Sequence, residues 1–387
     1  STCASGRTIG EAMNLYEFCY GILHWLVDLV NNLWYWLGDH LPWWFGDFFN
    51  AVGDFAASYG HLHFMTLLLE SLVIIIVALV NVLNFLWIFR KLSGRILDFY
   101  GPYYVGYRIG GWLQNLADGM KLFIKEIIVP AKADKVGFVL APVIFVGSSL
   151  LILATIPLSE NFGLSTSRDG TGVPASALFA LAMFAIAPFT ILLAGWSSNN
   201  KYTLIGGMRS AAQMMSYEIP LILCVASVFL LSGSFDFVGI VDAQHDVWFA
   251  IPLFIGFVVF LVCLIAEVEI IPFDLPEAEA ELVEGWTTEY GGMRFGLFYM
   301  TTAVRSYAGG ALATALFLGG WQGPAIIPDE IWFLIKAYIV YTVFMWLTWS
   351  VPRVRIDQML KFGWRRLLPL AVLNLLIAAT LKTMGWF

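Results

Sequence analysis

Long apolar runs separated by polar loops dominate the chain from residue 65 onward. A transmembrane helix needs roughly 20 predominantly apolar residues to cross a hydrocarbon layer of about 30 Å, and each run is long enough, the fourth only just. The pattern predicts an all-α polytopic membrane protein with about eight transmembrane helices and additional amphipathic helices at the membrane interface. The predicted spans are 65–89, 137–157, 174–196, 215–233, 247–267, 295–318, 329–350 and 367–387.

Residues 1–64 follow a different pattern, because tryptophans and acidic residues alternate there without an uninterrupted apolar run. Tryptophan favours the boundary between lipid and water, so this pattern predicts one or two amphipathic helices at the membrane interface. A helical hairpin packed on a partner subunit explains the same pattern equally well. We expect the chain to divide into this extension, 1–64, and an eight-helix membrane domain, 65–387.

Basic residues indicate how the spans are oriented. The positive-inside rule places loops rich in lysine and arginine on the cytoplasmic or matrix side, which leaves the extension and the C-terminus on the outer side. In the loop 90–136, Leu113, Leu116, Met120 and Phe123 share one face at helical spacing. This spacing predicts an amphipathic helix along the membrane surface over 112–125. Most of the 21 lysines and arginines fall in the loops 90–136, 197–214, 268–294 and 351–366.

Composition narrows the class further. Of 387 residues, 59% are hydrophobic and only 13% are charged, whereas soluble proteins carry about 25% charged residues. The net charge of −7 indicates no nucleic-acid partner. The four cysteines show no CxxC spacing, so we expect neither a metal site nor a tightly bound cofactor in this chain.

An acidic stretch between the fifth and sixth spans is the first candidate for chemistry. Ionised carboxylates beside membrane spans are costly, and like charges this close together shift one another's protonation, as a proton relay requires. Glu277, Glu281 and Glu284 share one face if the segment is helical. A solvated acidic surface is the alternative interpretation. The acids of the stretch are Glu267, Glu269, Asp274, Glu277, Glu279, Glu281 and Glu284.

Four segments resemble one family. The string PFDLPEAEAELVEGWTTEYGGMRFGLF at 272–298 is similar to the quinone-chamber membrane subunit of respiratory complex I, often called subunit 1 or the H subunit. Segments 113–126, 195–220 and 352–376 resemble the same family in the right order. The resemblance covers nearly everything from about residue 65 to the end, and residues 1–64 match nothing recognised in the family.

The resemblance implies a core membrane subunit of a proton-translocating NAD(P)H:quinone oxidoreductase. Such a subunit encloses the quinone substrate and couples its reduction to proton translocation, and it holds no redox centre of its own. The implied partners are peripheral-arm subunits carrying iron–sulfur clusters, antiporter-like membrane subunits and lipids. The implied location is the mitochondrial inner membrane or a prokaryotic cytoplasmic membrane.

Residue by residue, the resemblance assigns proton coupling to Glu218 together with the seven acids of the stretch. Some of the matched residues also have structural explanations, since interfacial aromatic rings need no ligand and inner-loop arginines follow the positive-inside rule. The residues expected in the quinone chamber or at its entrance are Asp118, Lys121, Trp286, Arg294, Phe295, Arg353 and Arg355.

The chain departs from the family's usual charges at four positions, which are Phe89, Phe99, Ile270 and Thr302. The acidic path is therefore thinner than usual, and its route stays open. Arg305 is an additional charge inside the sixth span, and we hypothesise that it compensates for the missing family charges. Two other functions stay open on the sequence: the membrane anchor of an energy-converting hydrogenase-type complex, and a free-standing ion transporter.

Overall fold

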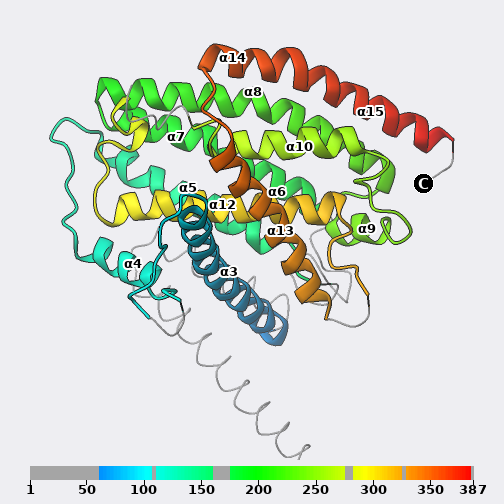
Figure 1. Ribbon diagram of the computed structural model, residues 1–387, viewed down its shortest axis with the longest axis horizontal. Helices are drawn as coiled ribbons and strands as arrows, with labels where there is room; N and C mark the ends of the chain where they lie inside the picture. Colours follow the sequence, from blue (N-terminus) through cyan, green and yellow to red (C-terminus); the bar gives the residue numbers. More distant parts are fainter. Residues whose placement is uncertain (1–60, 107–109, 160–174, 275–281, 325–327, 385–387) are drawn as a thin grey trace, which may run out of the picture. The chain divides into compact units, whose positions relative to one another are not determined.

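The computed structural model describes residues 61–106, 110–159, 175–274, 282–324 and 328–384 (Figure 1). The predicted extension therefore lies almost entirely outside the described residues, as do Glu277, Glu279 and Glu281. The described part is helical and contains no β-strand, which confirms the all-α prediction. The chain divides into two units, 1–73 and 74–387, and the second contains the candidate site.

Helices coincide with every predicted span. Five segments of the described part are long and apolar enough to cross a membrane, namely 135–155, 176–197, 201–232, 329–350 and 356–383. The chain is thus an integral membrane protein. The helices at the predicted spans are α3 (His61–Ile96), α5 (Lys135–Thr155), α6 (Ser176–Phe184) with α7 (Ile186–Ser197), α8 (Lys201–Ser232), α10 (Phe254–Glu267), α12 (Met293–Phe317), α13 (Asp329–Ser350) and α15 (Leu368–Thr383).

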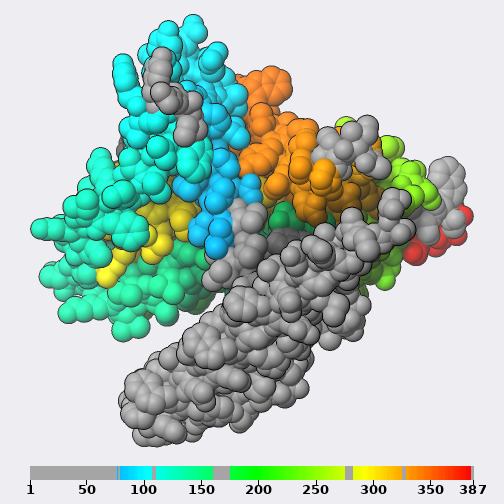
Figure 2. All heavy atoms as spheres, turned by 90° about the horizontal axis from the view of Figure 1, so that it is seen from below, coloured from blue at the N-terminus to red at the C-terminus, as the bar shows by residue number. Residues whose placement is uncertain are grey.

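Shorter elements connect the long helices. They are α4 (Gln114–Ile124), α9 (Phe237–Asp242), the 3₁₀ turn η2 (Gly285–Thr287), α14 (Ile356–Phe362) and the π turn η3 (Gly363–Leu367). Helix α4 confirms the helix predicted over 112–125, and its apolar residues Leu116, Met120 and Phe123 are exposed. It packs on the start of α12, and Figure 2 shows the yellow start of α12 framed by the cyan and teal residues of α4 and α5.

Helix α8 is much longer than the predicted span 215–233. It begins after Asn200, whose side chain accepts a hydrogen bond from the Tyr202 amide (3.2 Å), and it ends at Gly233, which has a φ of 72°. A side-chain cap and a left-handed glycine are the usual signals for these two ends. Residues 201–214, predicted as a loop because of their polarity, are therefore helical, and they carry Ser210 and Gln213 into the bundle.

Helix α12 lies at the centre of the second unit and contacts α5, α10 and α13 (Figure 1). Its second half is rich in alanine and glycine, and small residues let transmembrane helices approach closely. A Cβ atom on Gly310 would lie 3.1 Å from the Ala337 carbonyl oxygen of α13, so this crossing depends on a missing side chain. The close packing leaves nearly the whole of 303–317 buried, including Arg305.

Candidate functional site

A buried ion pair joins α10 to α12. The Arg305 Nη2 atom lies 3.0 Å from Glu267 Oε1, and the exposed fractions of the two side chains are only 1% and 2%. The guanidinium carbon also lies 4.6 Å from the Phe184 ring centroid and 5.5 Å from that of Phe145. Cation–π contacts of this kind offset part of the cost of removing a charge from water.

The sequence dictates where this arginine finds a further acceptor. Pro188 lacks an amide hydrogen, so it leaves the Phe184 carbonyl without its helical partner and separates α6 from α7 at Ala185. Arg305 Nη2 donates to that carbonyl oxygen at 3.5 Å. A proline in the third span therefore supplies a backbone acceptor to a cation in the sixth.

Glu269 lies just beyond this pair, in the loop after α10. It accepts a hydrogen bond from the Ser210 hydroxyl of α8, and its φ of 59° is rare for a residue with a side chain. The pKa of the Glu269 carboxyl is raised to about 7, chiefly by burial and to a smaller extent by Asp274, against the lowering effect of the Ser210 hydrogen bond. A carboxyl with this pKa can both donate and accept a proton near neutral pH.

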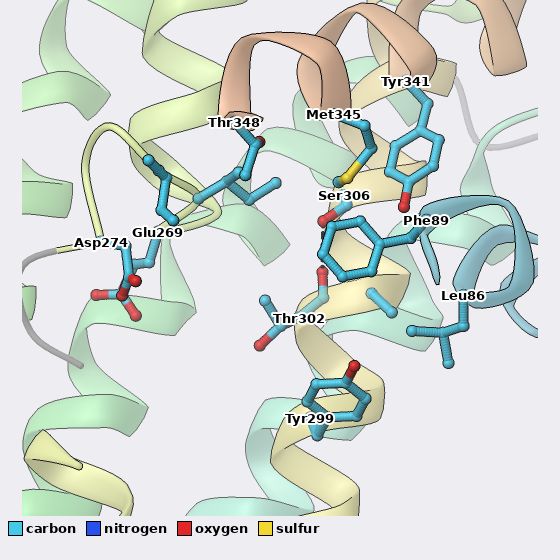
Figure 3. A pocket seen from close by; sticks show the side chains of 13 residues that line it. Leu86, Phe89, Glu269, Asp274, Tyr299, Thr302, Ser306, Tyr341, Met345 and Thr348 are labelled. Carbon is cyan, nitrogen blue, oxygen red and sulfur yellow. Dashed lines mark hydrogen bonds between the residues drawn. The ribbon is translucent and has the colours of Figure 1, made fainter. Parts of the chain in front are cut away.

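A cavity of about 190 Å³ lies between α3, α12, α13 and the loop after α10. Cavities of roughly 150 Å³ bind benzene, so one substituted aromatic ring fits here. Figure 3 shows the carboxylates of Glu269 and Asp274 together on one side and the Phe89 ring opposite. Tyr341, Met345 and Thr348 of α13 complete the lining. The cavity therefore has an apolar wall and an acidic wall.

Three of the four departures from the family's usual charges lie in this one cavity. Phe89 comes from α3, Ile270 from the loop after α10 and Thr302 from α12, and all three line it. Phe99 lies elsewhere and is 73% exposed. Three positions that are usually charged in the family are therefore uncharged around one cavity, although they lie far apart in the sequence. The carboxylates of its lining are those of Glu269 and Asp274.

The acids form an electrostatic chain that leads inward from the cavity. Glu269 interacts with Asp274 at the cavity and with both Glu267 and Arg305. Glu218 of α8, half-buried, interacts with Glu267 and Arg305 from the other side. The structure therefore brings together four of the eight acids assigned to proton coupling. Glu284 is exposed, and the remaining three lie outside the described residues.

The residues predicted for the chamber entrance occupy other places. Asp118 of α4 pairs with Arg90 of α3, and Lys121 is exposed. Arg353 Nη2 lies 2.9 Å from Asp274 Oδ2, a carboxylate that lines the cavity, whereas Arg355 is exposed. The roles of these four residues stay predictions.

Trp286, Arg294 and Phe295 belong to a separate aromatic cluster. Trp286 is buried against Phe298 (ring centroids 4.8 Å apart), and the Arg294 guanidinium lies 5.2 Å from the Phe138 ring. Phe295 packs against the same cluster. None of the three lines this cavity, although Trp286 lies close enough to Glu269 to influence its carboxyl, and their predicted roles in the quinone chamber stay predictions.

Two polar residues of the site escaped the sequence analysis. Ser210 bonds Glu269 in the loop after α10, and Gln213 Nε2 donates to the Ala266 carbonyl oxygen, in the last turn of α10, at 2.9 Å. No local pattern distinguishes them from other polar residues of the segment. Arg305 was visible as a charge inside an apolar run, but its partner could not be read from the sequence.

Comparison with known proteins assigns a family to this architecture. A family model described as NADH dehydrogenase matches residues 69–379. The chain is 44% identical over 296 residues to the H subunit of the NADH-quinone oxidoreductase of Anoxybacillus flavithermus, a match that covers 76% of this chain and 87% of that protein. It is 37% identical over 337 residues to an H subunit, numbered 2, of the NADH-quinone oxidoreductase of Geobacter metallireducens, covering 83% and 97%. A similar relative, of Bacillus thuringiensis, is 43% identical over 296 residues.

Proposed function

The chain belongs to the NADH dehydrogenase family, and from this premise we propose that it is the membrane subunit that encloses the quinone of a proton-translocating NADH:quinone oxidoreductase. The relatives named above carry the word quinone in their names and match this chain over most of their length. The observation that carries the proposal is the cavity whose acidic wall connects to a buried chain of carboxylates.

The cavity suits one face of a quinone ring. Phe89, Tyr341 and Met345 offer apolar contact, and the Glu269 carboxyl, beside the Asp274–Arg353 ion pair, offers a proton at the other side. Reduction of a quinone to a quinol takes up two electrons and two protons. The electrons arrive from partner subunits, and carboxyl groups beside the ring are placed to deliver protons.

Proton translocation follows from the same geometry. Each proton that Glu269 delivers to the quinone changes the charge on Glu269, and the coupled protonation of Glu267 and Glu218 responds. We propose that the acidic stretch, including Glu277, Glu279, Glu281 and Glu284, continues this path on the inner side. Peripheral-arm subunits with iron–sulfur clusters and antiporter-like membrane subunits are the proposed partners, with the termini on the outer side of the membrane.

Filling the cavity tests the proposal. Ala303 lines it and is 8% exposed, so Ala303→Phe places a ring where the quinone ring is proposed to bind. We expect the KM for a short-chain quinone to rise at least tenfold in the assembled complex, measured as NADH oxidation in proteoliposomes. Ala303→Ser nearly keeps the volume and serves as the control. An assembled Ala303→Phe complex with the wild-type KM would place the quinone elsewhere.

A further inference from the structure

The Arg305–Glu267 pair contains polar atoms that the described residues leave unsatisfied. Glu267 Oε2 and the Arg305 Nε and Nη1 atoms are buried without a hydrogen-bond partner in the described part of the chain. The Gln213 Oε1 atom, whose amide nitrogen bonds the adjacent Ala266 carbonyl, is in the same situation. Buried polar atoms nearly always have a partner, so this group of unsatisfied atoms points to something bound between them.

The chemistry of these atoms identifies what binds. Two of them, on Glu267 and Gln213, are acceptors when the acid is ionised, and the two on Arg305 are donors. A metal cation satisfies only the acceptors and an anion satisfies only the donors. Water both donates and accepts, and buried water typically makes about three hydrogen bonds to such groups. The site therefore suits ordered water.

This position lies between two ends of the acid chain. Glu269, which lines the cavity, interacts electrostatically with Glu267 and Arg305. Glu218 interacts with the same pair from α8. The Phe145 and Phe184 rings cover the guanidinium from the remaining sides. Arg305 is thus the one cation among these four charged groups.

We propose that Arg305 is a positioning residue for proton transfer: it fixes Glu267 and bridging water between Glu269 at the cavity and Glu218 in the bundle. The inference rests on the proposed function and adds a residue to its route. Each transfer breaks the O–H bond of one carboxyl group and forms a new O–H bond on the next carboxylate, with water carrying the proton between them. No electron and no further reactant is needed.

Two variants of the intact complex test the inference in proteoliposomes, by proton uptake per NADH oxidised. Arg305→Lys keeps the positive charge but loses the two-pronged geometry. We expect its proton uptake per NADH to fall at least threefold, and that of Arg305→Met to fall at least tenfold. A purely structural pair predicts lower yield of the complex and an unchanged ratio. Wild-type ratios in both variants would overturn the proposal.

A double-mutant comparison covers the case in which Arg305→Met leaves an unpaired acid and prevents assembly. Glu267→Gln and Glu267→Gln/Arg305→Met both lack the buried negative charge. Because Arg305 is proposed to act through Glu267, the double variant should show the same proton uptake per NADH as Glu267→Gln alone. A further tenfold loss in the double variant would refute that route. Failure of the wild-type complex to couple quinone reduction to proton uptake would instead refute the proposed function.

Discussion

Two buried cations of the same unit, Lys336 and Arg305, are satisfied in opposite ways. Lys336 of α13 is 8% exposed, and its ammonium donates to three carbonyl oxygens, those of Leu318 (2.8 Å), Gly320 (3.0 Å) and Gln322 (2.7 Å). All three donors of the ammonium are used. The carbonyls belong to the turn that follows α12, so this lysine fastens the end of one helix to the next.

Arg305 carries more hydrogen-bond donors than Lys336, and fewer of them have a protein partner in the described part of the chain. It donates to one carboxylate and one carbonyl, and its Nε and Nη1 atoms have no partner in the described part of the chain. The ammonium of Lys336 uses all its donors on backbone oxygens that stay in place, so its hydrogen bonds do not change during turnover. A cation whose remaining donors bond acids and exchangeable water can rearrange its hydrogen bonds when an acid changes charge. The difference separates a structural charge from a functional one, and it can be tested from both sides.

The largest effect on stability is expected at Lys336. Lys336→Met leaves three carbonyls without their donor, and at about 1 kcal/mol for each hydrogen bond the loss is about 3 kcal/mol. The yield and the thermal midpoint of the detergent-solubilised complex should fall, while turnover per assembled complex should stay within twofold of wild type. Size-exclusion chromatography after heating measures the yield and the thermal midpoint, and NADH oxidation measures the turnover.

A second lysine supplies the matched control. Among the described residues, Lys382 of α15 donates one hydrogen bond, to the Leu231 carbonyl oxygen at 2.9 Å. Lys382→Met should therefore lower the midpoint by about a third as much, in proportion to the number of bonds. If Lys336→Met lowered the turnover of assembled complex as strongly as Arg305→Met, the two cations would not differ in role.

The sequence predicted the spans because apolar runs are sufficient to specify them. It missed how far two helices extend. Residues 201–214 were expected in a loop, yet their polar groups bond within the fold, as Thr203 does by donating to the Gly195 carbonyl oxygen at 3.1 Å. Conversely α10 starts later than the run at 247–267, because the Ala250 amide donates to the Phe317 carbonyl oxygen at 2.9 Å and not to its own helix. Each bond joins two different helices or a helix and a loop, and local patterns of apolar residues do not encode such contacts.

The site was predictable only in part, for a similar reason. Glu267, Glu269 and Asp274 are close in sequence, so their grouping was visible as a cluster of acids. The wall facing them comes from α3 and α13, which lie far away along the chain. That Phe89, Ile270 and Thr302 share one cavity could not be deduced from their separation, and it required the helix crossings to be known.

Glu269 provides the next test, because it lies between the cavity and the Arg305–Glu267 ion pair. With its pKa raised to about 7 by burial, the folded protein holds this proton more tightly than the unfolded chain. Its contribution to stability is full in acid and is lost as the pH rises through about 7. If Glu269 donates a proton to the quinone, turnover should fall over the same range, and Glu269→Gln should abolish that inflection in the pH profile of NADH oxidation.

Ser210 tunes the same group. Its hydroxyl bonds the ionised carboxylate and lowers the pKa of Glu269, so Ser210→Ala should raise that pKa further. A hydrogen bond to a charged group is worth about 1.5–3 kcal/mol, of which part is replaced by water, so we expect the inflection to move by about one pH unit toward alkali. Ser216, which bonds the Ala212 carbonyl of its own helix, is the control. Equal profiles for Ser210→Ala and Ser216→Ala would contradict the assignment.

The smallest expected effect concerns the acceptor that Pro188 provides. In Pro188→Ala the new amide can bond the Phe184 carbonyl within the helix, which removes an acceptor from Arg305. Since that contact is long, at 3.5 Å, proton uptake per NADH should fall only about two- to threefold, corresponding to less than about 1 kcal/mol. Pro142 lies inside the continuous helix α5, and the carbonyl that it leaves without a helical partner is that of Phe138, which Arg305 does not use, so Pro142→Ala should leave the ratio unchanged. If the two substitutions acted alike, Arg305 would not depend on the carbonyl that Pro188 leaves free, and its unsatisfied atoms would matter through Glu267 alone.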